Sequence, residues 1–401
     1  MMTTQRASAY IETEERLGAH NYRPLDVVIS HGEGVWLYDV EGRRYLDCIS
    51  AYSAVNQGHR HPRIVAALME QAQRVTLTSR AMRHDRFAPF LEKLTSVCRQ
   101  EMALPVNTGV EAVETAIKLA RRWGYRVKGI PAGQARIVVA RNNFHGRTTT
   151  VIGFSSEPQY RADFGPFTPN FDHVTFGEIE SLRAAIGPQT CAVMLEPVQG
   201  EGGVVVPPDG YLRAVRQLCS ENNVLFLADE IQTGFGRTGD LFACDHEDVS
   251  PDILIVGKAL GGGLYPVSAA LASREIMSLF GPGDHGSTFG GNPLACAVGE
   301  AALDVVVEER LAERARSAGE RLRKGLRLAG GSHVREVRGR GLLIGVELGM
   351  PARPLADALQ ARGVLAKDTH RTVLRIAPPL VIEDAEIEFL VNAFGEALAA
   401  L

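Results

Sequence analysis

The sequence predicts an α/β protein, with a large domain whose mostly parallel sheet lies between helices and a smaller α+β domain after it. Between residues 104 and 266, short apolar runs alternate with amphipathic helices, and charged helices and short strands follow residue 309. The chain has 401 residues, of which 45% are hydrophobic and 22% charged. This length and composition allow two hydrophobic cores and exclude a globally disordered chain.

The first fifty residues contain one strong local signal. Val35–Asp39 and Arg44–Asp47 flank a four-residue turn that contains glycine, a pattern typical of a β-hairpin. We expect an N-terminal segment over 1–56 that carries this hairpin. The large α/β domain is expected over 57–295 and the small C-terminal domain over 296–401.

The central strands are predicted from near-continuous apolar runs, as expected where helices cover both faces of a sheet. These runs are Arg136–Ala140, Cys191–Leu195, Val224–Ala228 and Ile253–Val256. The helices expected in the same region are Pro62–Val75, Val110–Trp123, Glu180–Ile186 and Tyr211–Asn222. For the C-terminal region we expect helices Leu294–Glu309, Leu311–Leu328 and Asp384–Leu401 and strands Val334–Val337, Leu342–Glu347 and Val373–Ile376.

Charge and cysteine usage narrow the class of protein. The formal net charge is −4 and no basic stripe is visible, so we expect no nucleic-acid partner. No apolar run approaches the roughly 18 residues that a membrane span needs, and Met1–Arg6 is polar, unlike a signal peptide. The six cysteines are scattered without close pairs, which is typical of reduced thiols. We therefore expect a cytoplasmic protein that does not bind membranes.

Two charged residues follow neighbouring apolar strands. Asp229 follows Val224–Ala228, and Lys258 follows Ile253–Gly257 and precedes several glycines. Ligands of open α/β sheets bind beyond the carboxyl ends of strands. Each residue alone fits a helix cap or a solvated lysine. Together they favour pyridoxal phosphate (PLP), because a lysine can form a Schiff base with it and a carboxylate can keep its ring nitrogen protonated.

A phosphate cofactor also requires an anion site. Thr108 and Glu111 have the spacing of a helix capping box, and Gly109 lets the chain approach a ligand closely. The free amides of Gly109 and Val110 would point at a phosphate from the helix N-terminus. Alone, this is an ordinary helix cap.

With these residues in place, the chain resembles the class III aminotransferases of PLP fold type I. The spacing of Asp229 and Lys258 fits that family, as do the segments 196–203 and 286–293. The resemblance implies that Lys258 carries PLP and moves protons, while Asp229 pairs with the pyridine nitrogen. It also assigns cofactor contacts to Gln232 at the phenolic oxygen, to Phe144 at the ring face, to Gly109 and Val110 at the phosphate, and to Ser287 and Thr288 of the partner subunit. A homodimer, or a higher oligomer built from dimers, is therefore expected.

Within this class the sequence is most similar to the ornithine aminotransferases, over segments 21–25, 52–59, 144–148 and 374–379. The resemblance implies that Tyr22, Tyr52 and Arg147 recognise L-ornithine, with Arg147 on its α-carboxylate. Glu201 and Arg375 match a switchable pair: Glu201 covers Arg375 when ornithine binds and releases it for 2-oxoglutarate. This arrangement suits a site that must accept a diamine and then a dianion.

Several alternatives stay open at this point. Other class III ω-aminotransferases act on N-acetylornithine, 4-aminobutyrate or lysine, and Tyr52 argues against them. His145 stands where some ornithine enzymes carry an aromatic residue, which weakens the substrate assignment slightly. A fold type I aminomutase or decarboxylase would need no Glu201–Arg375 switch, and a non-catalytic binding protein would not need Lys258 and Asp229. We expect no metal, because His59 and His61 have no acidic or cysteine partners nearby in the sequence.

Overall fold

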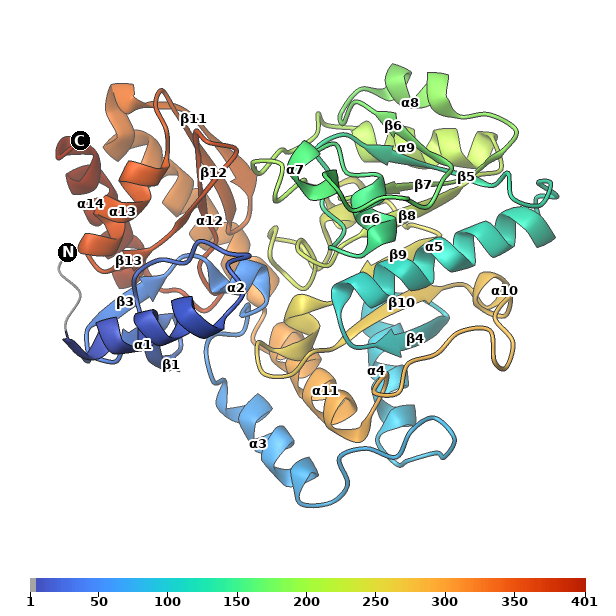
Figure 1. Ribbon diagram of the computed structural model, residues 1–401, viewed down its shortest axis with the longest axis horizontal. Coiled ribbons are helices and arrows are strands. Elements are labelled where there is room, and N and C mark those ends of the chain that lie inside the picture. The colour runs from blue at the N-terminus through green and yellow to red at the C-terminus, as the bar shows by residue number, and fades with distance from the viewer. Residues whose placement is uncertain (1–4) are drawn as a thin grey trace.

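The computed structural model describes residues 5–401, so Met1–Thr4, where the expected N-terminal segment begins, lie outside the described residues. A seven-stranded sheet forms the centre of one half of the molecule, in the order β4-β10-β9-β8-β7-β5-β6 (Figure 1). Its strands are β4 (Met102–Val106), β5 (Arg136–Ala140), β6 (Phe171–Val174), β7 (Thr190–Leu195), β8 (Leu225–Asp229), β9 (Ile253–Val256) and β10 (Ser268–Ala272). Strand β10 pairs antiparallel with both β4 and β9, and the remaining pairs of this sheet are parallel.

Helices cover both faces of this sheet. Along β5, the side chains of Ile137 and Val139 pack in one apolar cluster with helix α5 (Gly109–Arg126). Val138 and Ala140 alternate with them and pack on the other face with the helices α8 (Ile179–Ala185) and α9 (Tyr211–Glu221). Because successive side chains of a strand point to opposite faces, a strand covered on both sides must be apolar throughout.

Two four-stranded sheets build the other half. One joins β11 (Val334–Arg340), β12 (Leu343–Leu348), β15 (Val373–Ile376) and β14 (Lys367–Thr369), all antiparallel. The other joins β1 (Ile29–Glu33), β2 (Trp36–Asp39), β3 (Arg44–Asp47) and β13 (Val364–Leu365). Because β3 pairs with β13, the N-terminal hairpin shares a sheet with the C-terminal region.

The remaining elements are mostly helices. The longer ones are α1 (Gln5–Leu17), α3 (Pro62–Ala72), α4 (Phe87–Cys98), α11 (Pro293–Glu308), α12 (Leu311–Gly330), α13 (Arg353–Ala361) and α14 (Asp384–Ala399). The short ones are α2 (Ser50–Ser53), α6 (Thr149–Gly153), α7 (Pro158–Arg161), α10 (Arg274–Met277), and the 3-10 turns η1 (Ala243–Glu247), η2 (Lys258–Gly261) and η3 (Gly331–His333). Helices α12 and α14 pack against each other, and α12 also packs on β11.

The predicted fold class is confirmed, and three predicted strands, Arg136–Ala140, Ile253–Val256 and Val373–Ile376, form with the expected bounds. The helix expected to reach Val75 ends at Ala72. The strands that were not predicted are β1, β4, β6, β10, β13 and β14, and the longer helices that were not predicted are α1, α4 and α13. Strand β10 has the sequence Ser-Ala-Ala-Leu-Ala, which lacks the β-branched and aromatic residues that are typical of a strand. The division at residues 56 and 295 stays a proposal.

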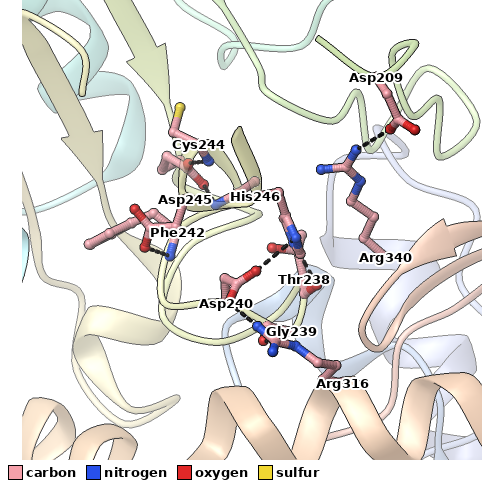
Figure 2. A network of polar contacts seen from close by, with 12 residues as sticks. Asp209, Thr238, Gly239, Asp240, Phe242, Cys244, Asp245, His246, Arg316 and Arg340 are labelled. Carbon is pink, nitrogen blue, oxygen red and sulfur yellow. Dashed lines mark hydrogen bonds and ion pairs between the residues drawn. The ribbon is translucent and has the colours of Figure 1, made fainter. Parts of the chain in front are cut away.

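Polar contacts tie the loop after β8 to the C-terminal half (Figure 2). The Arg316 guanidinium, on α12, pairs with Asp240 and donates from Nε to the carbonyl oxygen of Gly239 at 3.1 Å. The His246 ring bridges the loop itself, with Nδ1 2.7 Å from Asp240 and Nε2 2.9 Å from the Thr238 carbonyl oxygen. These bonds hold the loop against α12.

Arg237, the largest fully buried side chain within residues 5–401, joins three distant segments. Its Nη2 donates to Asn56 Oδ1 at 2.6 Å, and its Nη1 donates to the carbonyl oxygens of Leu342 at 3.0 Å and Pro378 at 2.6 Å. Burial lowers the pKa of Arg237 to about 9. A fully buried guanidinium is tolerated only where its donors are satisfied, so this residue fixes the two halves together.

We predict that Arg237→Met lowers the apparent free energy of unfolding by about 3 kcal/mol, because it leaves Asn56 and two carbonyl oxygens buried without donors. Urea denaturation followed by circular dichroism measures this loss. Arg321→Met is the control, since Arg321 lies on the surface of α12 in an ion pair with Asp384 and should change the value by less than about 1 kcal/mol. Equal effects of the two substitutions would show that Arg237 does not join the halves.

Candidate active site

The carboxyl ends of three adjacent strands place charged side chains in one space. Glu196 follows the last residue of β7, Asp229 is the last residue of β8, and Lys258 follows β9 after Gly257. The strand register brings Leu195 opposite Ala228 and Asp229 opposite Ile255. All three charged residues line a cavity of about 200 Å³, together with Gly109, Val110, Phe144, His145 and Gln232.

A buried pair orients Asp229. The Nδ1 atom of His145 lies 2.6 Å from Asp229 Oδ2, and the backbone amide of Ile231 donates to Oδ1 at 3.1 Å. Burial works against a charged imidazole, but the hydrogen bond and charge of Asp229 outweigh it and raise the pKa of His145 above its ordinary value. His145 and the Ile231 amide thereby fix the orientation of the Asp229 side chain, which lines the cavity.

The surroundings of Lys258 favour the neutral form of its amine. Burial lowers its pKa, although the carboxylates of Glu201 and Asp229 act in the opposite direction. Lys258 has a φ of +44°, a left-handed backbone conformation that is rare outside glycine and is found preferentially at functional sites. A lysine with a lowered pKa has a larger neutral, nucleophilic fraction at neutral pH.

Glu196 connects two loops of the site. Its Oε2 accepts the Phe144 amide at 3.0 Å and its Oε1 accepts the Gly200 amide at 3.4 Å. Burial raises the pKa of Glu196 to about 7. Sequence reasoning did not single out this residue, although it directly follows an apolar strand, as Asp229 does.

The N-terminus of α5 forms the far wall of the cavity. Glu111 accepts from the backbone amides of Asn107 at 2.9 Å and Thr108 at 2.6 Å, which confirms the carboxylate half of the predicted capping box. Within residues 5–401 the amides of Gly109 and Val110 donate to no acceptor. Two free amides at a helix N-terminus suit an anionic group such as phosphate.

The predicted Glu201–Arg375 pair is present. Arg375 Nη1 lies 2.5 Å from Glu201 Oε1, and the Arg375 side chain is 4% exposed. Burial works to raise the pKa of Glu201, but the charge and hydrogen bonds of Arg375 outweigh it, so the pKa lies below its ordinary value. Gln232 Nε2 donates to the same carboxylate at 3.3 Å and to the Tyr52 carbonyl oxygen at 3.4 Å, which connects the pair to the cofactor cavity.

Four other residues predicted for the site do not line this cavity in the single chain. The Tyr22 side chain is exposed, and the Arg147 guanidinium lies over the Tyr160 ring at 3.7 Å from its centroid. Ser287 accepts from Asn107 Nδ2 at 2.7 Å in its own chain, while Thr288 is exposed. The roles of these four residues stay predictions.

The cavity has the features that PLP requires. It combines the free amides of α5, the aromatic ring of Phe144, a carboxylate and an amine. Two of its buried polar atoms, His145 Nε2 and Gln232 Oε1, have no hydrogen-bond partner within residues 5–401, as expected for a site shaped around a polar ligand. The described residues contain no cluster of three or more His, Cys, Asp or Glu suited to a metal ion.

The chain belongs to the class III aminotransferases, whose family model matches residues 17–398. It is 53% identical to the ornithine aminotransferase of Brevibacillus brevis over 98% of both chains. Among solved structures, the ornithine aminotransferase of Toxoplasma gondii superposes with a TM-score of 0.97 at 41% identity, over 98% of this chain and 94% of that one. The acetylornithine aminotransferase of Elizabethkingia anophelis superposes with a TM-score of 0.90 at 46% identity, over 99% and 100%. The resemblance drawn from the sequence is confirmed, and PLP is the cofactor.

We predict that Gly200→Ala weakens PLP retention about tenfold or more. A Cβ at this position would lie 1.4 Å from Gln232 Oε1, so Gln232 must move and lose its contacts with Glu201 and Tyr52. The measurement is the PLP dissociation constant, read from cofactor absorbance after dialysis. Gly187→Ala is the matched control, because a Cβ there meets no atom within 4 Å. Unchanged retention in Gly200→Ala would contradict the role given to Gln232.

Proposed function

We propose that this enzyme transfers the δ-amino group of L-ornithine to 2-oxoglutarate. The products are glutamate and glutamate 5-semialdehyde, which cyclises to 1-pyrroline-5-carboxylate. The Glu201–Arg375 pair carries the proposal, because one cavity must accept a diamine with a single α-carboxylate and then a dicarboxylate. The names of the relatives in Brevibacillus and Toxoplasma support the same donor.

Lys258, Asp229 and Gln232 have different roles in the proposed amino transfer. PLP, when bound, would supply a carbonyl carbon that takes up the amino group and an electron-withdrawing ring beside it. Lys258 would hold the cofactor and act as the acid and base that removes and returns the proton at the reacting carbon, for which its lowered pKa suits it. Asp229, oriented by His145, holds a proton at the pyridine nitrogen, and Gln232 would contact the phenolic oxygen.

Regiochemistry depends on where the α-carboxylate of ornithine is held. We assign that carboxylate to Arg147, aided by Tyr22 and Tyr52, at the end remote from Lys258. Glu201 neutralises Arg375 meanwhile, so no nearer guanidinium is free to bind this carboxylate and thereby bring the α-amine to Lys258. When 2-oxoglutarate binds, release of Arg375 from Glu201 provides the anchor for its α-carboxylate.

We further propose a homodimer in which Ser287 and Thr288 approach the phosphate site of the partner subunit. The exposure of Thr288 and of the neighbouring Phe289, which is 49% exposed, supports a contact surface there. We place the enzyme in the cytoplasm, which fits its six buried, unpaired cysteines. Its product chemistry suits proline biosynthesis or arginine metabolism. Within residues 5–401, no helix has the length and apolar character to cross a bilayer.

The second candidate is transfer from N-acetylornithine, favoured by the 46% identity to the Elizabethkingia enzyme. Ornithine, N-acetylornithine, 4-aminobutyrate and lysine, each supplied with 2-oxoglutarate, distinguish the candidates. Trapping of 1-pyrroline-5-carboxylate by o-aminobenzaldehyde identifies δ-transfer. We expect ornithine to give the highest kcat/KM and the trapped product. A higher kcat/KM for N-acetylornithine would overturn the proposal, and turnover without any oxo acid would indicate an aminomutase or decarboxylase.

We predict that Lys258→Ala loses turnover by several orders of magnitude, because both the nucleophile and the proton carrier are removed. Borohydride reduction of the wild-type enzyme followed by peptide mapping should place the pyridoxyl group on Lys258. Lys258→Arg is the matched variant: it keeps the positive charge but not the nucleophilic amine, and we expect it to be equally inactive. Near-normal turnover in either variant would contradict the assignment.

A further inference from the structure

A lysine outside the cofactor cavity contacts a predicted substrate residue. Lys367 Nζ, on β14, donates to the Tyr52 hydroxyl oxygen at 2.8 Å. The same ammonium nitrogen lies 5.1 Å from the centroid of the Tyr52 ring, and the Cζ atom of Arg375 also lies 5.1 Å from it. Tyr52 therefore lies close to two cationic side chains that are far from it in the sequence.

The two cations differ in how they are compensated. Arg375 is paired with the carboxylate of Glu201. Within residues 5–401, Lys367 forms no ion pair, and its hydrogen bond goes to a neutral hydroxyl. While Glu201 covers Arg375, the positive charge of Lys367 beside Tyr52 is not cancelled by an ion pair, and it favours a carboxylate over an ammonium at this place.

The bond from Lys367 also decides what the Tyr52 hydroxyl can do. A phenolic hydroxyl has one proton to donate, and its oxygen accepts. Because the oxygen already accepts from an ammonium, the proton of the hydroxyl remains available for an acceptor. A carboxylate oxygen is the strongest acceptor that a substrate of this enzyme offers.

The backbone around Tyr52 is strained, and its surroundings hold it in this conformation. The four residues from Ser50 to Ser53 have φ values of 47°, 45°, 60° and 72°, a left-handed run without glycine. The Asp47 carboxylate supports the start of this run, accepting the amides of Ile49 at 2.8 Å and Ser50 at 2.9 Å. Such strain is kept where the surroundings impose it, most often at ligand sites. Tyr52 and Lys367 both line a cavity of about 340 Å³, so a small solute can reach the pair.

We propose that Lys367 is a positioning residue that sets substrate specificity: by binding the Tyr52 hydroxyl, it turns that hydroxyl toward a carboxylate at the substrate end remote from the reacting amine. The inference rests on the proposed function, since it concerns the α-carboxylate of ornithine. Under this proposal Lys367, on β14, is a further residue that determines which amino donor the enzyme uses.

The test compares ornithine with 1,4-diaminobutane, the same diamine without the carboxylate, on the PLP-loaded enzyme. We expect Lys367→Met to raise the KM of ornithine about 10- to 100-fold, the range of one charge-assisted hydrogen bond, with kcat within about threefold of wild type. The diamine is measured as a competitor of ornithine, so its binding is read whether or not it reacts. Its inhibition constant should stay the same or fall, because the diamine offers no carboxylate and the Lys367 charge no longer repels its second ammonium.

Three further variants separate positioning from general structural damage. Lys367→Arg keeps a cationic donor and should recover most of the ornithine affinity. Lys367→Met should change the KM of ornithine by less than about twofold in a Tyr52→Phe background, because the hydroxyl through which it acts is absent. Lys324→Met, at an exposed lysine of α12, controls for the loss of a lysine and should match wild type.

The outcomes are distinguishable. If the wild-type enzyme does not use ornithine, the proposed function fails. If it does, and Lys367→Met leaves the KM of ornithine unchanged or weakens the diamine equally, the inference about Lys367 is wrong. A full Lys367→Met effect in the Tyr52→Phe background would show that Lys367 does not act through the hydroxyl, which also overturns it.

Discussion

The ion pair between Glu201 and Arg375 is the interaction on which the rest of the site depends. A guanidinium that is 4% exposed would be strongly unfavourable without a counter-charge, and Glu201 is the only carboxylate within residues 5–401 that pairs with it. Glu201 lies in the loop after β7 and Arg375 on β15, so the pair joins the two halves of the chain. Release of Arg375 from Glu201, as proposed above, would let one cavity present two different electrostatic faces.

The rest of the molecule fixes the groups around this pair. Adjacent strands bring Glu196, Asp229 and Lys258 to one edge of the sheet, where all three line one cavity. Glu196 ties the loop of Phe144 to that of Gly200, so the aromatic wall of the cavity and the loop of Glu201 share one support. Arg237 then holds the N-terminal and C-terminal segments against the large sheet.

Much of this could be predicted from the sequence, because strands buried on both faces must be apolar and the residue after each strand must then lie at the site. Asp229 and Lys258 were found in this way, and Glu196 gives the same signal. Other features depend on contacts between distant segments. Strand β14 has only three residues, too few for a periodic pattern, so the contact of Lys367 with Tyr52 is visible only in three dimensions. Arg147 and Tyr22 lie on the surface of the single chain, so their predicted roles depend on the resemblance and not on contacts within the chain.

The most direct test of this account is the single-turnover reaction of the PLP-loaded enzyme with glutamate, followed by cofactor absorbance, in Glu201→Ala. Removing the carboxylate frees Arg375, so the account predicts a glutamate half-reaction about tenfold faster or more, together with a slower reaction of ornithine. Glu201→Gln, which removes the charge but keeps a hydrogen-bonding group, should fall between wild type and alanine. An unchanged glutamate half-reaction in Glu201→Ala would contradict the switch.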